Sequence, residues 1–330
     1  MIKSIAQAKK SIYIEMYIFL DDTTASYDFI GLLKKQALAG VEVVIIADAF
    51  GSLEMKKNTI TELRQIGVEF LLFSHFWHRT HRKIVVVDKR IAFVGGVNIE
   101  QKIINWQDIQ IKMAGNKTVK AVLRSLARTY QSCGGRKKHI LAYYEKSIIK
   151  KIKSLVLESL PIHNINSLKE YYKDKIISAQ KSIKITTPYL TPPRWLMALL
   201  DDARRRNVEI EILFPKNTDH KIFDKINHSY ASQLLPTGIK FYSNPKMNHA
   251  KILLVDDAEA LVGSQNLDSL SFGHNLEVGV FFKQKEIVKE LNQIFDKWKS
   301  QSTPFQVTAI RLNCWERIEV KIIRLFFSII

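Results

Sequence analysis

Two histidine–lysine pairs are the residues of this chain whose types and spacing could do chemistry. His81 and Lys83 form one pair, and His249 and Lys251 form the other, with a single residue between the members of each. Alternate residues of a strand share a face, so each imidazole is expected beside its ammonium group. An imidazole can attack phosphorus or transfer a proton, and an ammonium neutralises phosphate oxygens, so the pairs predict phosphate chemistry.

The same residue types follow each pair at the same spacing. Each copy continues with an aspartate, a glycine and an asparagine: Asp88, Gly95 and Asn98 after the first pair, and Asp256, Gly263 and Asn266 after the second. The glycines permit a close backbone approach that would bring the asparagines to the same space. The aspartates end their strands, so capping or an ion pair explains them at least as well as catalysis. Each histidine has a lysine two positions on rather than a soft ligand, so no metal is expected.

The two pairs belong to a longer internal repeat. Residues 80–100 align without gaps on residues 248–268 at a constant offset of 168, and nine of these 21 positions are identical. A single histidine beside an apolar strand is usually structural. Here the same histidine–lysine pair occurs twice, each time followed by the same glycine and asparagine, which argues for function. A repeat of about 150 residues is a normal domain size, so the chain is predicted to be two fused copies of one domain.

Short β-branched runs alternate with segments of helical period in each copy. Strands are expected at 11–19, 41–47 and 84–87, and again at 182–187, 208–214 and 252–255, with helices at 27–39 and 193–206. This order predicts an α/β fold with a mainly parallel sheet in each half. We expect the first copy at 1–133, a basic inter-repeat segment at 134–167, the second copy at 168–300 and an amphipathic tail at 301–330.

The charge of the chain predicts an anionic partner. Its 330 residues include 50 Lys and Arg against 32 Asp and Glu, which gives a net charge of +18. Eleven Lys and Arg but only one acidic residue, Glu145, lie between positions 117 and 153, either as a solvated face or as a surface for an anionic membrane. Composition does not choose between nucleic acid, an anionic lipid surface and a phosphate-bearing substrate.

Cysteine content and hydropathy indicate the compartment. Cys133 and Cys314 are too few for a disulfide framework, which favours a reducing compartment. No run reaches the ~18 apolar residues of a spanning helix, and Glu15 interrupts the first apolar run, which argues against a signal peptide. The chain is therefore expected to be cytosolic or membrane-peripheral. Residues 315–330 have an apolar face at helical spacing that suits either core packing or insertion in a membrane interface.

The duplicated motif resembles that of the phospholipase D superfamily, whose signature of His-x-Lys followed by Asp, Gly and Asn occurs here twice. Further stretches resemble bacterial cardiolipin synthases of that superfamily, among them IEMYIFLDD (14–22), TPYLTPP (187–193), FPKNTDH (214–220) and GSQNLDSLSF (263–272). The resemblance covers residues 4–300. It implies two phospholipase D-like α/β/α sandwiches related by a pseudo-twofold axis, with the active site between the halves.

The resemblance also implies a mechanism without metal or cofactor. One histidine attacks the phosphodiester phosphorus and the other protonates the departing glycerol, then deprotonates the incoming hydroxyl. By superfamily analogy His81 is the nucleophile and His249 the acid and base. The residues that match the rest of the family's site are Lys83, Lys251, Asn98 and Asn266 for the phosphate, Asp108 and Glu277 for orienting the histidines, and the motif aspartates Asp88 and Asp256. Ser264 has no hydroxyl counterpart at Gly96, an asymmetry that could distinguish the two histidines.

The sequence therefore predicts a cardiolipin synthase-like phosphatidyltransferase that joins two phosphatidylglycerols and releases glycerol. We expect a peripheral monomer on the cytoplasmic side of a bacterial cell membrane, with anionic phospholipid as substrate and surface and no nucleic acid as partner. Two alternatives stay open, a phosphodiesterase that hydrolyses lipid or nucleic acid and a non-catalytic module that binds either. Members of the family usually begin with a further strand and helix start, so a truncated N-terminus is expected.

Overall fold

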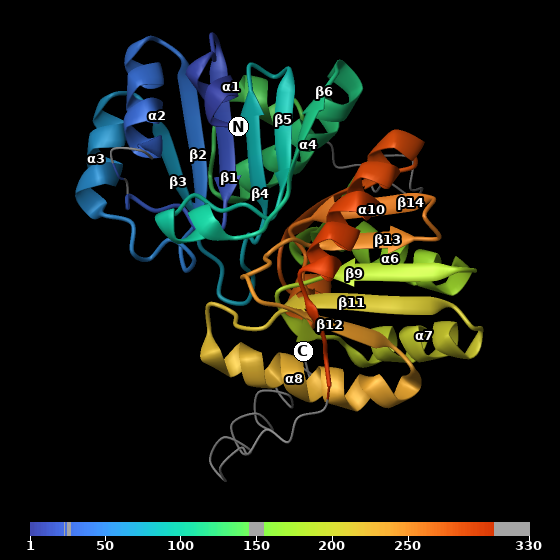
Figure 1. Ribbon diagram of the computed structural model, residues 1–330. Coiled ribbons are helices and arrows are strands. Elements are labelled where there is room, and N and C mark those ends of the chain that lie inside the picture. The colour runs from blue at the N-terminus through green and yellow to red at the C-terminus, as the bar shows by residue number, and fades with distance from the viewer. Residues whose placement is uncertain (23, 25–27, 145–154, 307–330) are drawn as a thin grey trace. The chain divides into compact units, whose positions relative to one another are not determined.

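The chain folds into two compact units, each of which draws on three separate segments of sequence. The computed structural model describes residues 1–22, 24, 28–144 and 155–306 (Figure 1). Unit 1 comprises Met1–Asn105, Ile109–Ile165 and Asn275–Gly279, and unit 2 comprises Trp106–Asp108, Asn166–His274 and the chain from Val280 onward. Two short segments, 106–108 and 275–279, therefore pack in the unit that holds the other repeat.

Unit 1 is built on a six-stranded sheet. Its strands run in the order β3 (Glu69–Phe73), β2 (Glu42–Asp48), β1 (Ser11–Met16), β4 (Lys83–Val87), β5 (Ile91–Gly95) and β6 (Gln110–Ala114). β1, β2 and β3 are parallel to one another, whereas β4 pairs antiparallel with β1 and the hairpin continues antiparallel through β5 and β6. All six residues of β1 are buried, as expected for the central strand of a sheet covered on both faces.

Helices cover the two faces of this sheet. Ile12, Ile14 and Met16 of β1 join one apolar cluster with residues of α2 (Phe29–Leu38) and α3 (Lys57–Gln65). The intervening side chains of β1 point to the other face, where α4 (Asn116–Ser132) packs against β4 and β6. The remaining elements of the unit are α1 (Ile2–Ala6), α5 (Lys138–Leu141), β7 (Val156–Leu160) and the 3-10 helices η1 (Gln101–Asn105) and η2 (Pro161–His163).

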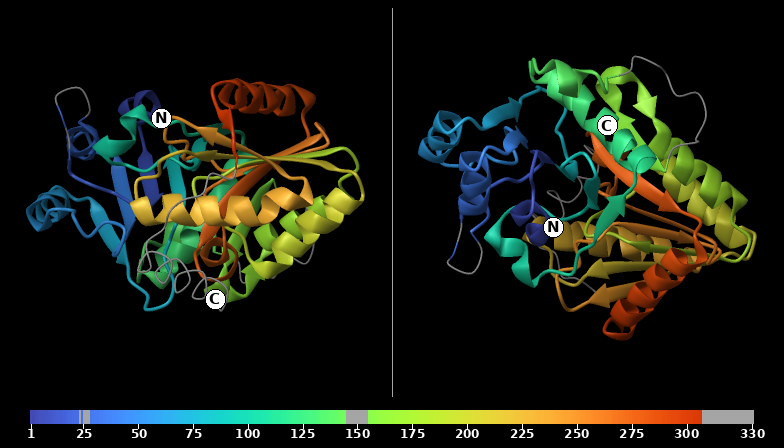
Figure 2. Two further views of the ribbon diagram at one scale, coloured as in Figure 1. Left: turned by 60° about the horizontal axis from the view of Figure 1, so that its bottom comes forward. Right: turned by 90° about the horizontal axis from the view of Figure 1, so that it is seen from above.

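Unit 2 repeats this plan. Its sheet runs β17 (Thr303–Pro304), β12 (Lys240–Asn244), β11 (Glu209–Pro215), β9 (Ser182–Thr186), β13 (Ile252–Val255), β14 (Glu259–Gly263) and β16 (Glu277–Phe282). Figure 2 shows α10 (Lys285–Ser300) on one side of the sheet and α6 (Ser167–Ser178) and α7 (Arg194–Arg205) on the other. The other elements are α8 (Lys221–Leu234), α9 (Ser269–Gly273), η3 (Leu235–Thr237), β8 (Ile165–Asn166), and the short parallel pair β10 (Leu190–Thr191) and β15 (Leu267–Asp268).

The predicted α/β fold with two copies of one domain is confirmed, but the sheets are mixed rather than mainly parallel. In unit 1 two of the five strand pairings are parallel and three are antiparallel. The reason is local, because only Asp88–Arg90 separate β4 from β5, and a turn that short can join only antiparallel neighbours. β13 and β14 of unit 2 are joined by an equally short turn.

Two sequence predictions fall outside the described residues. The amphipathic segment at 315–330 lies wholly beyond residue 306, and ten residues of the basic inter-repeat segment, 145–154, are likewise not described. Among the helices that are described, none is both long enough and apolar enough to cross a membrane.

Candidate active site

In unit 1 the first histidine–lysine pair lies at the start of β4. His81 precedes the strand and Lys83 is its first residue, and both side chains are buried. The His81 backbone N–H donates to the Leu276 carbonyl at 3.0 Å, and Thr80 forms an isolated parallel bridge with Leu276. The short segment 275–279 thus pairs with the backbone of Thr80 and His81.

Glu277, on that segment, holds the His81 ring. The Nδ1 atom of His81 lies 3.0 Å and 3.2 Å from the two carboxylate oxygens of the fully buried Glu277. A carboxylate can only accept, so an ionised Glu277 places the ring proton on Nδ1 and the lone pair of the neutral ring on Nε2. The arrangement suits a nucleophile or a general base acting through Nε2.

Lys83 and Asn98 supply donors and acceptors in the same unit. Lys83 Nζ donates to the His81 carbonyl at 2.8 Å and lies 5.1 Å from the centroid of the Tyr17 ring, whose edge also faces His81. Asn98 is buried and donates from Nδ2 to Glu100 at 3.2 Å, whereas its Oδ1 has no hydrogen-bond partner among the described residues. A buried amide oxygen without a partner is unusual and indicates a place where a ligand donor could bind.

Unit 2 repeats this half-site with its own exchanged segment. The backbone N–H of His249 donates to the Gln107 carbonyl at 2.7 Å, and His249 Nδ1 lies 2.8 Å from Asp108 Oδ2. Lys251 Nζ donates to the His249 carbonyl at 2.6 Å. Asn266 is buried and, like Asn98, has an Oδ1 atom without a partner in the described part of the chain. Both repeats thus build one imidazole held by a carboxylate, one ammonium and one amide.

The carboxylates come from the opposite repeat, which sequence reasoning did not predict. Asp108 follows the first motif in sequence but contacts the histidine of the second motif, and Glu277 does the reverse. Spacing after the asparagine located both residues, but it could not say which histidine each one orients. Ser264 is fully buried close to the second motif in sequence, where unit 1 has only Gly96.

The structure places Asp88 and Asp256 away from the phosphate-binding groups. Each follows the last residue of its strand, at φ values of 52° and 55°. Asp88 accepts hydrogen bonds from the backbone N–H groups of Lys9, Lys10 and Ser11, and Asp256 accepts the same three bonds from Gln180, Lys181 and Ser182. Five residues of strand separate Lys83 from Asp88, about 16 Å, which is too far for one phosphate to touch both. The geometry supports the capping alternative for these aspartates.

A buried ionic network behind His81 was not predicted either. Arg82, the middle residue of the first pair, is fully buried, donates to Glu158 at 3.0 Å and lies 3.9 Å from Glu15. Arg128 pairs with the other oxygen of Glu158, and Glu15 accepts a 2.6 Å bond from Thr80, the neighbour of His81. At the corresponding positions of the second repeat stand Ala250 and Thr186, and this contrast between aligned positions was the signal in the sequence.

The environment of Glu15 shows what the network does. Burial raises the pKa of Glu15, and the nearby Arg82 guanidinium opposes that rise. A buried carboxylate needs such compensation to remain charged. The network therefore holds Thr80, and through it the backbone next to His81, by paired charges, whereas the aligned positions of unit 2 are occupied by the uncharged Ala250 and Thr186.

Comparison with known proteins places these residues in a family context. A family model described as "Cardiolipin synthase, PLD-like domain" matches residues 1–129 and 172–299. The chain is 31% identical over 320 residues to a cardiolipin synthase of Clostridium perfringens (strain SM101 / Type A), covering 90% of this chain and 67% of that protein. It is 30% identical over 327 residues to a probable cardiolipin synthase of Bacillus subtilis (strain 168), covering 91% of this chain and 63% of that one. The chain thus spans about two thirds of the length of these curated relatives.

Solved structures show the same fold at low identity. Phosphatidylserine synthase of Haemophilus influenzae Rd KW20 superposes with a TM-score of 0.74 and 15% identity, covering 98% of this chain and 89% of that one. Polyphosphate kinase of Porphyromonas gingivalis gives a TM-score of 0.64 with 12% identity, covering 98% of this chain and 51% of the kinase. At these identities the likeness is one of fold.

Proposed function

Since the chain belongs to the cardiolipin synthase family of phospholipase D-like domains, we propose that it transfers a phosphatidyl group from one phosphatidylglycerol to another, forming cardiolipin and releasing glycerol. The observation that carries the proposal is the pairing of each motif histidine with a carboxylate through Nδ1. Two imidazoles oriented through Nδ1, one acting as nucleophile and one as acid and base, are what a two-step displacement at phosphorus requires.

The first step forms a covalent intermediate. His81 Nε2 attacks the phosphorus of one phosphatidylglycerol, and the bond from phosphorus to the glycerol headgroup oxygen breaks. Protonated His249 gives its Nε2 proton to that oxygen, so neutral glycerol leaves. Lys83 and Lys251 neutralise the phosphoryl oxygens, and the amides of Asn98 and Asn266 donate to them.

The second step reverses the proton transfer. His249, now neutral, removes the proton from the free headgroup hydroxyl of a second phosphatidylglycerol as the oxygen attacks the phosphorus. The phosphorus–nitrogen bond to His81 breaks, cardiolipin leaves, and both histidines return to their starting protonation states. The two steps use side chains of this chain and two lipid molecules, and no cofactor.

Product analysis tests this reaction. Purified protein incubated with phosphatidylglycerol vesicles should give cardiolipin and free glycerol in equal amounts by mass spectrometry. His81→Ala and His249→Ala should each lower turnover by at least about 10³-fold with an unchanged unfolding curve, whereas His139→Ala, an exposed histidine of unit 1, should retain full activity. Near-normal activity in either motif variant would overturn the proposal, and phosphatidic acid as the sole product would replace the transferase with a hydrolase.

The remaining aspects of the proposal concern partners and place. Relatives named cardiolipin synthase support phospholipid as the class of substrate. We extend this to a peripheral monomer on the cytoplasmic side of the bacterial membrane, with phosphatidylglycerol as both substrate and surface. The alternative within the same chemistry is cleavage of nucleic acid, which an oligonucleotide assay run beside the lipid assay would detect.

A further inference from the structure

Two loops of unit 1 expose a concentrated group of large apolar side chains. Phe50 and Leu53, in the loop after β2, are 59% and 71% exposed, and Phe76 and Trp77, in the loop after β3, are 79% and 71% exposed. They are four of the ten large hydrophobic side chains exposed in the described part of the chain, and they include every aromatic ring in that set. The other six are dispersed over several elements, so this concentration calls for a specific explanation.

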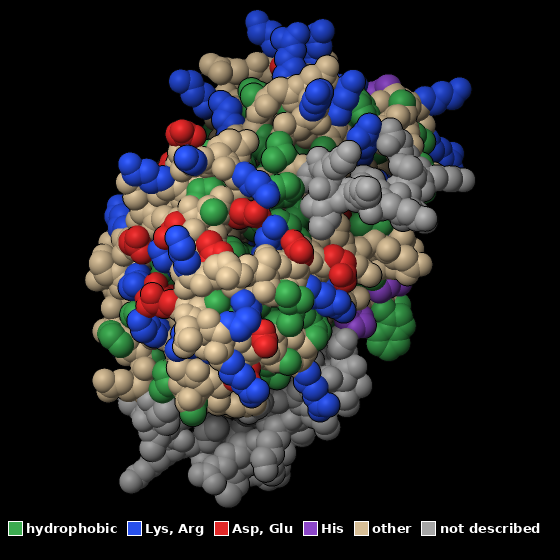
Figure 3. Space-filling model, turned by 90° about the vertical axis from the view of Figure 1, so that its right-hand side faces the viewer, with side chains coloured by type: hydrophobic (Ala, Val, Ile, Leu, Met, Phe, Trp, Pro, Cys, Tyr) green, Lys and Arg blue, Asp and Glu red, His purple; other side chains and the backbone are tan. Residues whose placement is uncertain are grey.

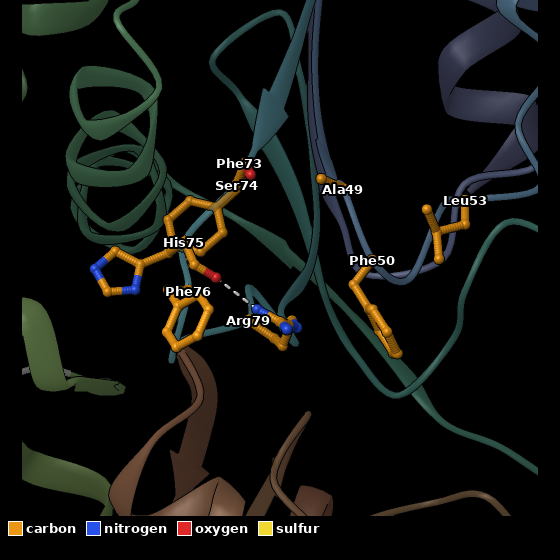
Figure 4. A pocket seen from close by; sticks show the side chains of 8 residues that line it. All are labelled: Ala49, Phe50, Leu53, Phe73, Ser74, His75, Phe76 and Arg79. Carbon is orange, nitrogen blue, oxygen red and sulfur yellow. Dashed lines mark hydrogen bonds between the residues drawn. The ribbon is translucent and has the colours of Figure 1, made fainter.

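The two loops line an open pocket of about 530 Å³. Figure 4 shows Phe50 of the first loop beside Arg79 of the second, with Phe73 and Phe76 beyond Arg79 and Leu53 on the far side of Phe50. The guanidinium carbon of Arg79 lies 5.0 Å from the centroid of the Phe50 ring. Arg79 also donates to the His75 and His78 carbonyls, so the second loop is folded around its side chain.

The charge around these loops is positive. Residues 74–79 read SHFWHR and contain Arg79 without an acidic residue. The first loop contains Glu54, but it is followed by two exposed lysines, Lys56, which also lies 3.8 Å from Asp21, and Lys57, the first residue of α3. Aromatic and aliphatic anchors rimmed by cations form the composition of surfaces that lie in the interface of an anionic bilayer. Trp in particular concentrates at the depth of the headgroups, and Phe and Leu form the apolar face of segments that bind there.

The loops share an edge of the sheet with His81. β2 and β3 end at Asp48 and Phe73, and both run parallel to β1, which ends at Met16. Lys83, the first residue of β4, pairs with Met16, so the histidine–lysine pair lies at that same edge. Trp77 lies four positions before His81, a span of at most about 14 Å of chain. When the two loops are anchored at the level of the headgroups, a lipid phosphate is therefore within reach of His81.

We propose that residues 49–55 and 74–79 form a membrane-docking surface, which binds an anionic phospholipid bilayer by inserting Phe50, Leu53, Phe76 and Trp77 at the level of the headgroups. Arg79 and the cations around it face the lipid phosphates, and the docked unit holds His81 at the depth of its substrate. The second part of this inference rests on the proposed phosphatidyl transfer, whereas docking itself does not.

Vesicle binding by the full chain tests the docking surface directly. Cosedimentation with vesicles of phosphatidylglycerol and phosphatidylcholine should show binding that the double variant Phe76→Ser/Trp77→Ser weakens at least about tenfold. Leu53→Ser should weaken it severalfold, whereas Leu38→Ser should leave it unchanged. Leu38 ends α2 and is 72% exposed, which matches Leu53 at 71% in residue type and exposure but lies outside the loops.

The outcomes separate docking from catalysis. Binding of the double variant equal to that of native protein overturns the proposal, and so does an equal loss in Leu53→Ser and Leu38→Ser. Turnover of a short-chain phosphatidylglycerol below its micellar concentration should be the same in native and double-variant protein, which shows that the half-sites are intact. If no lipid is turned over at all, the transferase proposal fails while the binding comparison still decides the docking surface.

Discussion

The carboxylate–imidazole pairs decide which ring nitrogen of each histidine carries the proton in the neutral form. Glu277 holds Nδ1 of His81 from a fully buried position, and Asp108 holds Nδ1 of His249. Each carboxylate selects one tautomer and stabilises the charged ring after proton uptake. Neither needs to touch substrate, so both are positioning residues whose loss should appear in the rate rather than in the fold.

Glu277→Gln should lower turnover of phosphatidylglycerol by about two to four orders of magnitude. The amide keeps the shape of the side chain but cannot stabilise an imidazolium ring, and it admits the wrong tautomer of His81. Steady-state kinetics measures the effect, and the profile of kcat against pH should shift as well. Glu259→Gln, which removes a carboxylate that pairs with Lys175 and Lys283 and contacts neither motif histidine in the described structure, is the control. A Glu277→Gln enzyme within threefold of native would contradict the positioning role.

The motif aspartates should behave in the opposite way. Burial alone would raise the pKa of Asp88, but bonds from the backbone N–H groups of Ser11, Lys10 and Lys9 outweigh it and hold this pKa below its usual value. The ionised form is thus favoured in the folded state, so its stabilisation is present above the unfolded pKa of about 4 and is lost as the pH falls through the folded pKa.

Asp88→Ala should therefore lower the free energy of unfolding by about 1–2 kcal/mol at pH 7, with kcat little changed. Urea denaturation at pH 7 and at pH 3 measures it, and the difference between variant and native protein should shrink at the lower pH. Loss of turnover without loss of stability would instead assign Asp88 a part in the chemistry.

At the scale of elements, periodic features were predictable and partnerships were not. The offset of 168 and the short β-branched apolar runs located β4 and β13, and β13 matches its predicted range, Ile252–Val255. The β4–β5 hairpin makes part of the sheet antiparallel because a three-residue turn joins antiparallel neighbours, and β6 adds a further antiparallel strand after a longer connection. The exchange of segments 106–108 and 275–279 between units leaves no trace in spacing, since sequence assigns a residue to the repeat in which it stands.

The ionic network of unit 1 could not be predicted for the same reason, because its members are distant in sequence. Arg82 on the approach to β4, Glu15 on β1, Arg128 on α4 and Glu158 on β7 come from four distant parts of the chain, and no period links them. Only the contrast between Arg82 and its counterpart Ala250 marks the position as unusual. A buried arginine among carboxylates is stabilising only while its partners remain paired.

Arg82→Ala should lower the free energy of unfolding of unit 1 by about 3–5 kcal/mol, because it leaves Glu15 and part of Glu158 as buried charges without compensation. Urea denaturation followed by circular dichroism gives the value. The control, Arg90→Ala, removes an exposed arginine at the far end of β4 and should cost less than about 0.5 kcal/mol. A loss below about 1 kcal/mol for Arg82→Ala would show that water or a shift of the helix replaces the pairing.

At the scale of the whole molecule, more than half of the net charge of +18 comes from residues 117–153, but basic side chains are not confined to that segment. Lys and Arg side chains lie over much of the face seen in Figure 3. Part of the basic run at 117–153 is used inside unit 1, since Arg128 pairs with Glu158 and Lys137 pairs with Glu42 and Glu69. The position of a cation relative to the membrane-docking surface, more than the total number of cations, should decide whether it contacts a membrane.

Two pairs of exposed lysines in unit 1 allow that idea to be tested at constant charge. Lys56 and Lys57 follow the first docking loop, whereas Lys117 and Lys120 lie at the start of α4. β6 starts at Gln110, opposite Gly95, and ends at Ala114, so α4 begins at the edge of the sheet away from the loops. The strand spans about 16 Å, which exceeds the Debye length of about 10 Å in 0.1 M salt.

Lys56→Gln/Lys57→Gln should therefore weaken binding to phosphatidylglycerol vesicles about ten- to thirtyfold in 0.1 M NaCl, because each lysine near an anionic surface contributes on the order of 1 kcal/mol. Lys117→Gln/Lys120→Gln removes the same charge and should change binding by less than about threefold. In 1 M NaCl, where the Debye length is about 3 Å, the first variant should approach native protein, since apolar insertion persists and the charge contribution is screened. Equal losses in the two variants at low salt would mean that net charge, and not the edge carrying the loops, directs the protein to the bilayer.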